Sequence, residues 1–111
     1  MEDRRKIRED ERNLIAFLLG KLSLTTEQYP INEDVKEYEG GKMGSISMGN
    51  PDISPYKDDL IQAKYVDSDG TEVVITLTQC VNNQLLDLDF WKVDFSKLIT
   101  YPKPKDLTFV D

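Results

Sequence analysis

The chain contains no histidine and only one cysteine, Cys80, among its 111 residues. Without an imidazole, the sequence excludes histidine acid–base chemistry, Ser-His and Cys-His nucleophiles and nearly all zinc sites. A lone cysteine cannot form an internal disulfide and is typical of a reducing compartment. Cys80 also stands next to a predicted turn with no basic neighbour, so nothing in the sequence indicates an activated thiol.

Positive charge and long apolar runs are also scarce. The 14 Lys and Arg residues are outnumbered by 21 Asp and Glu residues, which gives a net charge of −7. Nucleic-acid binding depends on an excess of Lys and Arg, so we expect no nucleic-acid partner. The acidic balance suits a basic protein partner, or serves solubility alone. The apolar run Leu14–Leu19 is far too short to span a bilayer, and residues 1–6 precede no signal-peptide core. The sequence therefore predicts a cytoplasmic protein without membrane association.

Length and composition predict one domain over residues 1–111. Its clearest element is a helix over residues 4–22, with one apolar face at helical spacing made of Ile7, Leu14, Ile15, Leu18 and Leu22. Glu11 projects into this face. We interpret this as a helix that overhangs its sheet, with Arg4 and Arg8 on the same side to pair with Glu11. A buried functional carboxylate is the alternative.

From Val35 onward, apolar residues alternate with polar ones, which indicates strands. The expected strands cover residues 35–39, 42–48, 60–66, 72–79 and 85–93, followed by an extended C-terminal tail over 99–111. Gly40-Gly41 predicts a two-residue hairpin turn between the first two strands. Gly44 is expected where another group approaches its strand closely.

The turn residues also predict the register of the later strands. A type I′ turn at Asn82-Asn83 gives the pairs Leu77–Leu88, Ile75–Phe90, Thr78–Asp87, Thr76–Asp89 and Val74–Trp91. A three-residue loop at Ser68-Asp69-Gly70, with Gly70 left-handed, gives the pairs Tyr65–Val73, Ala63–Ile75 and Ile61–Leu77. A two-residue turn at Asp69-Gly70 would place Lys64 and Gln62 in the core, so it is rejected.

Both hairpins agree on one apolar sheet face, made of Ile61, Ala63, Tyr65, Val73, Ile75, Leu77, Leu86, Leu88 and Phe90. Only the N-terminal helix is available to cover it. We therefore predict an α+β fold, with an N-terminal helix packed on one face of a four- or five-stranded antiparallel β-meander. A binding surface would lie on the opposite face, where the candidate partner-binding residues are Lys64, Thr76, Asp87, Asp89 and Trp91.

Asp87 and Asp89 share that opposite face, roughly 7 Å apart at ~3.4 Å per residue. Paired carboxylates perform acid–base chemistry only in a cleft that raises a pKa, whereas these two lie on an open sheet among threonines and Lys64. A solvated face or a partner-binding surface explains them better than catalysis. Trp91 is either an interface anchor or is covered by the C-terminal tail or the Tyr29–Pro30 segment.

Two stretches match ligand-binding loops only in part. Asp67–Glu72 lacks the third oxygen ligand, the full spacing and the terminal glutamate of an EF-hand, so a plain hairpin is expected. Gly40–Ser45 lacks the spacing of a phosphate loop, and no helix follows it. We therefore predict no catalytic residue, no metal site and no cofactor.

Three stretches resemble an uncharacterised family of small stand-alone bacterial proteins. They are Glu39–Ile46, Asp67-x-Asp69-Gly70 and Leu86–Leu98, of which the first corresponds to the family's GGMGS-like turn and the last to its ELDIWKxDFSPL-like strand. The resemblance covers roughly residues 14–98, and the chain departs from it at Lys42, Phe90 and Lys97. It implies a domain of unknown function and supplies no catalytic or binding residue.

The leading hypothesis is a non-enzymatic bacterial protein that acts through protein–protein contact. By analogy of size and acidity, it would be an immunity-like or accessory protein with a basic or toxin-like partner. The alternative is a small-ligand-binding or enzymatic domain with a cavity between helix and sheet, in which Glu11 would be the internal acid.

Overall fold

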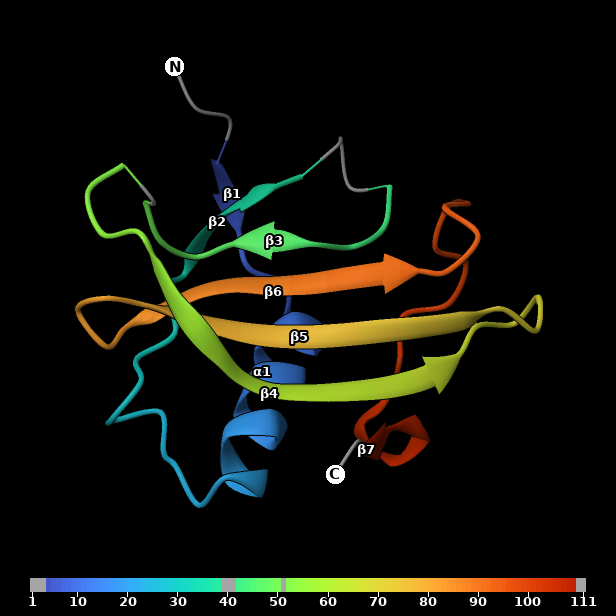
Figure 1. The fold of residues 1–111 in the computed structure, drawn as a ribbon, viewed down its shortest axis with the longest axis horizontal. Helices are drawn as coiled ribbons and strands as arrows, with labels where there is room; N and C mark the ends of the chain where they lie inside the picture. The colour runs from blue at the N-terminus through green and yellow to red at the C-terminus, as the bar shows by residue number, and fades with distance from the viewer. Residues whose placement is uncertain (1–3, 39–41, 51, 110–111) are drawn as a thin grey trace.

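The computed structural model describes residues 4–38, 42–50 and 52–109. Within them, one α-helix packs behind a seven-stranded antiparallel sheet (Figure 1), so the predicted α+β class is confirmed. The sheet order is β1-β2-β3-β6-β5-β4-β7. The elements in chain order are β1 (Arg4–Lys6), α1 (Glu9–Lys21), β2 (Asp34–Glu37), β3 (Ile46–Ser47), β4 (Tyr56–Val66), β5 (Glu72–Cys80), β6 (Leu85–Lys92), the 3-10 turn η2 (Pro104–Asp106) and β7 (Thr108–Phe109).

The helix begins five residues later than predicted. Residues 4–6 form the edge strand β1, which pairs with β2, and the Ile7 N–H donates to the Glu33 carbonyl at 2.7 Å. The Arg8 backbone is extended at ψ 156°, and its N–H donates to Glu11 Oε1 at 2.9 Å. This capping interaction starts the helix at Glu9. Ile7 is still buried, because it enters the core from the junction between strand and helix.

The sheet has more strands than the predicted four or five and is not a simple meander. β3 is two residues long and pairs with β6 rather than with β4, so β4 crosses to the other side of the β5–β6 pair. The tail also joins the sheet, because β7 pairs with β4 at Ala63–Phe109. The turn predicted at Gly40-Gly41 lies outside the described residues.

The β4–β5 hairpin has the predicted register, with Tyr65 opposite Val73 and Ala63 opposite Ile75. Its loop is the predicted three residues long. The Gly70 N–H donates to the Asp67 carbonyl at 2.9 Å, and Gly70 has a φ of +84°. A left-handed glycine at the end of such a loop gives the two strands their matching twist.

The β5–β6 hairpin reaches its predicted pairs by a different turn. The Cys80 N–H donates to the Gln84 carbonyl, so the loop between them has three residues. Its last residue, Asn83, lies in the left-handed region (φ +63°). A bulge beside Thr78 then restores the predicted register at Leu77–Leu88 and beyond. The predicted pair Thr78–Asp87 is therefore wrong, because at the bulge Thr78 no longer faces a single residue of β6. The predicted core also changes, because Leu85 rather than Leu86 joins the core cluster.

The core lies between α1 and the sheet face that the sequence predicted to be apolar. It contains Ile7, Leu14, Ile15, Leu18, Leu19, Val35, Ile46, Met48, Ala63, Tyr65, Val73, Ile75, Leu77, Leu85, Leu88 and Phe90. The C-terminal segment closes the same layer, because Tyr101 packs on Phe90 and Phe109 packs on Phe17. Gly44 has a φ of +89°, and the Leu98 side chain lies 3.1 Å from where its Cβ would stand, which confirms the expected close approach.

Candidate functional site

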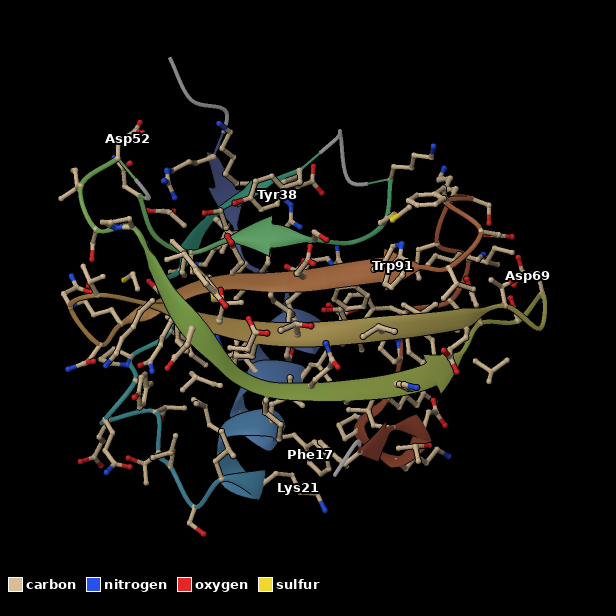
Figure 2. The ribbon with its side chains drawn as sticks, in the orientation of Figure 1. Phe17, Lys21, Tyr38, Asp52, Asp69 and Trp91 are labelled. Carbon is tan, nitrogen blue, oxygen red and sulfur yellow. The ribbon has the colours of Figure 1, made fainter. Side chains whose placement is uncertain are left out.

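The sheet face turned away from α1 carries the five candidate side chains. Figure 2 shows Trp91 and Tyr38 in front of the sheet, with α1 behind it. Three of the five candidates, Asp87, Asp89 and Trp91, line one hollow. The other two do not line it. Lys64 pairs with Glu72 at 3.9 Å, and Thr76 accepts a hydrogen bond from Gln62 at 3.0 Å.

The hollow has a volume of about 520 Å³ and lies beside the C-terminal half of β6. It forms because β3 is short and pairs with β6 only at Asp87 and Leu88. Farther along β6, the Ser45 hydroxyl bridges to the strand, where it accepts the Phe90 N–H at 2.8 Å. The lining joins aromatic, sulfur and acidic groups: Tyr38, Met43, Ser45, Asp87, Asp89, Phe90, Trp91 and Phe95. We call it the aromatic–acidic hollow.

The two carboxylates of the hollow are held by hydroxyl groups. Tyr38 donates to Asp87 Oδ1 at 2.7 Å, and Ser45 donates to Asp89 Oδ1 at 3.0 Å. Burial raises the pKa of Asp87 above its usual value and the charge of Asp89 adds to this, while the hydrogen bond from Tyr38 acts in the opposite direction. Neither carboxylate forms an ion pair with another described residue. Among the described residues, the negative charge of the hollow therefore has no cation paired with it.

Trp91 is not covered by the tail or by the Tyr29–Pro30 segment. Its indole is 48% exposed, and its ring centroid lies 6.3 Å from that of Phe95. The tail packs on the opposite side of the sheet, against Phe17 and Phe90. Of the two interpretations of Trp91 drawn from the sequence, the structure is compatible only with the exposed one.

Phe95 forms part of the hollow from a turn directly after β6, and the sequence analysis missed it. Its φ of +62° lies in the left-handed region, which bulky residues rarely adopt. The Phe95 N–H donates to the Lys92 carbonyl at 2.8 Å, and Asp94 accepts both the amide and the hydroxyl of Ser96. The ring is nevertheless 64% exposed. Such a backbone costs on the order of 1–3 kcal/mol, and an exposed ring returns little of this through burial.

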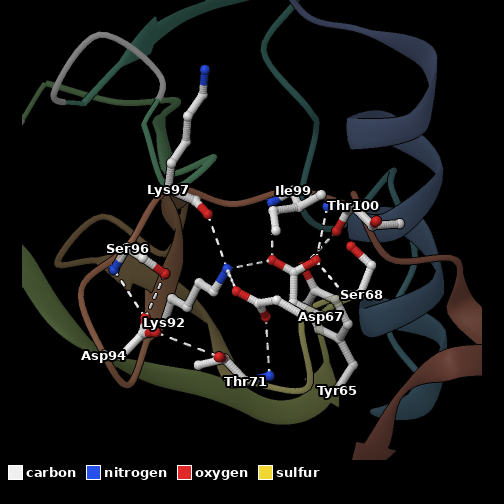
Figure 3. Close-up of polar contacts among 11 residues, drawn as sticks. Tyr65, Asp67, Ser68, Thr71, Lys92, Asp94, Ser96, Lys97, Ile99 and Thr100 are labelled. Atoms are coloured by element: carbon white, nitrogen blue, oxygen red, sulfur yellow. Dashed lines mark hydrogen bonds and ion pairs between the residues drawn. The ribbon is translucent and has the colours of Figure 1, made fainter.

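A buried ion pair at the end of β6 holds the Phe95 turn in place (Figure 3). The Lys92 side chain is fully buried, and its Nζ lies 2.9 Å from Asp67 Oδ2 and 2.8 Å from Asp69 Oδ2. The same Nζ donates to the Lys97 carbonyl at 3.0 Å. Lys92 thus ties the β4–β5 loop to the far end of the turn that carries Phe95.

Asp67 also anchors the segment that follows the Phe95 turn. Its carboxylate accepts the backbone N–H groups of Ile99 and Thr100, each at 2.9 Å, and that of Ser68 at 2.7 Å. Strand parity could have found the ion pair, because Asp67 continues the inward row of β4 and Lys92 continues that of β6. Both inward rows were predicted to end one residue pair earlier, at Tyr65 and Phe90, because charged residues are rarely buried.

We expect opposite titration shifts for Asp67 and Asp87. Burial opposes the charge on Asp67, but hydrogen bonds from Lys92 and from the amides of Ile99, Ser68 and Thr100 outweigh it and lower its pKa from 3.8 to about 2. Because folding lowers this pKa, the ionised carboxylate stabilises the fold above about pH 4, and this stability is lost as the pH falls through 2. A ¹³C NMR titration of the carboxyl carbons should place Asp67 low and Asp87 above its usual value. Equal pKa values for the two would contradict both environments.

Glu11 does not overhang the sheet, contrary to the favoured interpretation. Its side chain is fully buried, and both oxygens accept hydrogen bonds from the Arg5 guanidinium, at 2.9 and 2.8 Å. Arg8 is a partner as predicted, through its backbone and through its guanidinium at 3.5 Å. Arg4 instead donates to the carbonyls of Asp34 and Gly49. Glu11 is thus engaged in an ion pair and a helix cap.

The remaining candidate sites have structural explanations. The calcium-like stretch is a hairpin loop whose carboxylates, Asp67 and Asp69, are engaged by Lys92. Across residues 4–38, 42–50 and 52–109, no three His, Cys, Asp or Glu side chains are grouped as metal ligands. The Cys80 thiol is buried and donates to Asn82 at 2.8 Å. In the same part of the chain, the helix is too short and too polar to cross a membrane.

The fold defines a class of small α+β domain, in which a single helix covers one face of an antiparallel sheet and leaves the other face open. The chain belongs to the family described as domain of unknown function DUF6984, whose model matches residues 4–102. This span extends beyond the residues on which the family resemblance rests. No curated protein and no solved structure matches the chain.

Proposed function

We propose that the protein is a non-enzymatic protein–protein interaction domain, and that its partner docks on the aromatic–acidic hollow. The observation that carries this proposal is the pair of exposed rings, Trp91 and Phe95, beside two carboxylates on an uncovered sheet face. Aromatic side chains of this kind are enriched where interfaces concentrate their binding energy. An immunity-like or accessory role, with a basic partner, agrees with the net charge of −7.

The strained turn supports the same proposal. Phe95 could be replaced by glycine or asparagine with less backbone cost, so its ring is better explained by a contact made outside the chain. The Lys92–Asp67 pair fixes this turn from within, which gives the ring a defined position before binding. A preorganised surface loses less conformational freedom when it binds.

The alternative, a reaction or ligand site at Glu11, receives no comparable support. Its two oxygens are occupied by Arg5 and by the Arg8 amide. The hollow that contains carboxylates lies on the other side of the sheet.

Photo-crosslinking should capture the partner from inside the hollow. We expect p-benzoylphenylalanine at position 95, placed in the full chain in cells of the source organism, to give a discrete crosslinked product. Adding Trp91→Ala and Asp89→Ala should reduce this product about tenfold or more, because hot-spot truncations cost 2 kcal/mol or more. The Tm of the double variant should lie within about 4 °C of the Tm of the unsubstituted chain, since both side chains are exposed.

The matched control is the same photoreactive residue at Val81, which is 56% exposed in the loop at the opposite end of β6. Equal crosslinking from positions 81 and 95, or none from position 95, would reject the hollow as the docking surface. Unfolding of the double variant would show that Trp91 belongs to the core.

A further inference from the structure

The carboxylates of the hollow differ from the buried carboxylates elsewhere in the protein. Glu11 is paired with Arg5, and Asp67 is paired with Lys92, so each buried negative charge in those places has a cation of its own. Asp87 is half-buried beside Asp89, and within the part of the chain that the structure describes the two carboxylates are bound by the hydroxyl groups of Tyr38 and Ser45 and by no cation. Partial burial of the Asp87 charge beside a second, exposed carboxylate is costly without a cation, so an arriving positive charge would be favoured there.

The rest of the lining selects for the same chemistry. The faces of the Tyr38, Trp91 and Phe95 rings carry negative electrostatic potential, which attracts cations. An anion would be repelled by both carboxylates, and a purely apolar group would bury them without compensation. Of the common ligand classes, an organic cation with a flat or apolar body satisfies every wall of the hollow.

We propose that the aromatic–acidic hollow binds an arginine side chain of the protein partner, with its guanidinium against Asp87 and Asp89 and its flat surface on the aromatic rings. This inference rests on the proposed function and names the chemistry of the partner. A guanidinium stacks on rings and offers two parallel donors to a carboxylate, whereas the lysine ammonium is a compact, strongly hydrated point charge. The volume of about 520 Å³ lies within the range of sites that enclose a small group.

The protein carries its own reporter for this binding event. Trp91 is the only tryptophan in the chain, and it lines the hollow. Three capped tripeptides serve as probes, Gly-Arg-Gly, Gly-Lys-Gly and Gly-citrulline-Gly, where citrulline has nearly the shape of arginine without its charge. The arginine peptide should change Trp91 emission saturably, with a Kd in the millimolar range expected for one side chain. The citrulline peptide should produce no saturable change.

Charge variants localise the effect. Asp87→Asn with Asp89→Asn should weaken binding of the arginine peptide about tenfold or more, because the charge-assisted hydrogen bonds are lost. Asp59→Asn, at an exposed aspartate on β4, should leave it unchanged. Circular dichroism confirms that each variant is folded. Equal responses to arginine and citrulline, or an unchanged affinity in the double variant, would overturn the inference, and an equal response to lysine would overturn the choice of arginine.

The outcome separates this inference from the proposed function. If the Asp87→Asn, Asp89→Asn chain still crosslinks from position 95 at full yield, the hollow is a docking surface but its occupant is not a cation. If position 95 never crosslinks, the docking surface itself is wrong, whatever the peptides do.

Discussion

Replacement of Asp67 by alanine is expected to lower the free energy of unfolding by about 3–5 kcal/mol, the cost of removing one partner from a buried ion pair. The Lys92 ammonium would remain in the core with the Lys97 carbonyl and with Asp69, which is partly exposed, as its one charged partner among the described residues. Three backbone N–H groups, those of Ser68, Ile99 and Thr100, would also lose their acceptor. Chemical denaturation followed by circular dichroism measures the loss directly.

The matched control is Asp59→Ala, which removes an exposed carboxylate from β4, the strand that leads to Asp67, and should change the free energy of unfolding by less than about 1 kcal/mol. If both variants lost a similar amount of unfolding free energy, the burial of the Asp67–Lys92 ion pair would contribute nothing to stability. Because the ion pair holds the Phe95 turn, the Asp67 variant should also shift Trp91 emission while it is still folded.

Replacement of Glu11 by alanine should cost about 2–4 kcal/mol, somewhat less than the Asp67 change because Arg5 keeps partial contact with water. Burial alone would raise the pKa of Glu11, but hydrogen bonds from Arg5 and the Arg8 amide, together with the charges of both arginines, hold it below its usual value. The variant therefore loses an ion pair and a helix cap at once.

Asp10→Ala is the neighbouring control, since its ion pair with Arg8 is exposed and should contribute less than about 1 kcal/mol. Thermal unfolding of the two variants side by side gives the comparison. If the Glu11 variant were as stable as the Asp10 variant, the buried pair would be neutral, and the carboxylate would need another explanation.

Hairpin register could be derived from the sequence because the information is local. The loop Ser68–Gly70 requires a left-handed residue at its end, and only one choice of loop keeps Ala63 and Ile75 on the apolar face. The β5–β6 register was also correct from Leu77–Leu88 onward, although its turn was not. Two deviations cancel there, a longer loop and a bulge, and neither changes the alternation of apolar and polar residues along most of the strand.

Strand partners at the edges of the sheet could not be derived in the same way. Arg4–Lys6 reads as the first turn of a helix, because Ile7 is in phase with the helical apolar face. Its strand state depends on hydrogen bonds to β2, which is about thirty residues away in sequence (Arg4 pairs with Lys36). The same holds for β7 and for the placement of β3 beside β6, which together make the sheet wider than predicted.

The candidate site, too, could be predicted from the sequence only in part. Alternation by itself determined that Asp87, Asp89 and Trp91 share one face of a strand and that Leu88 and Phe90 share the other, because side chains of a strand point to opposite faces in turn. Only the tertiary structure decided that these three line a hollow with Tyr38, Met43 and Phe95. That decision depends on the short β3 and on the buried Lys92–Asp67 pair. The pairing of β3 with β6 joins segments distant in sequence, and the ion pair places two charged residues in the core, where charged residues are rarely found.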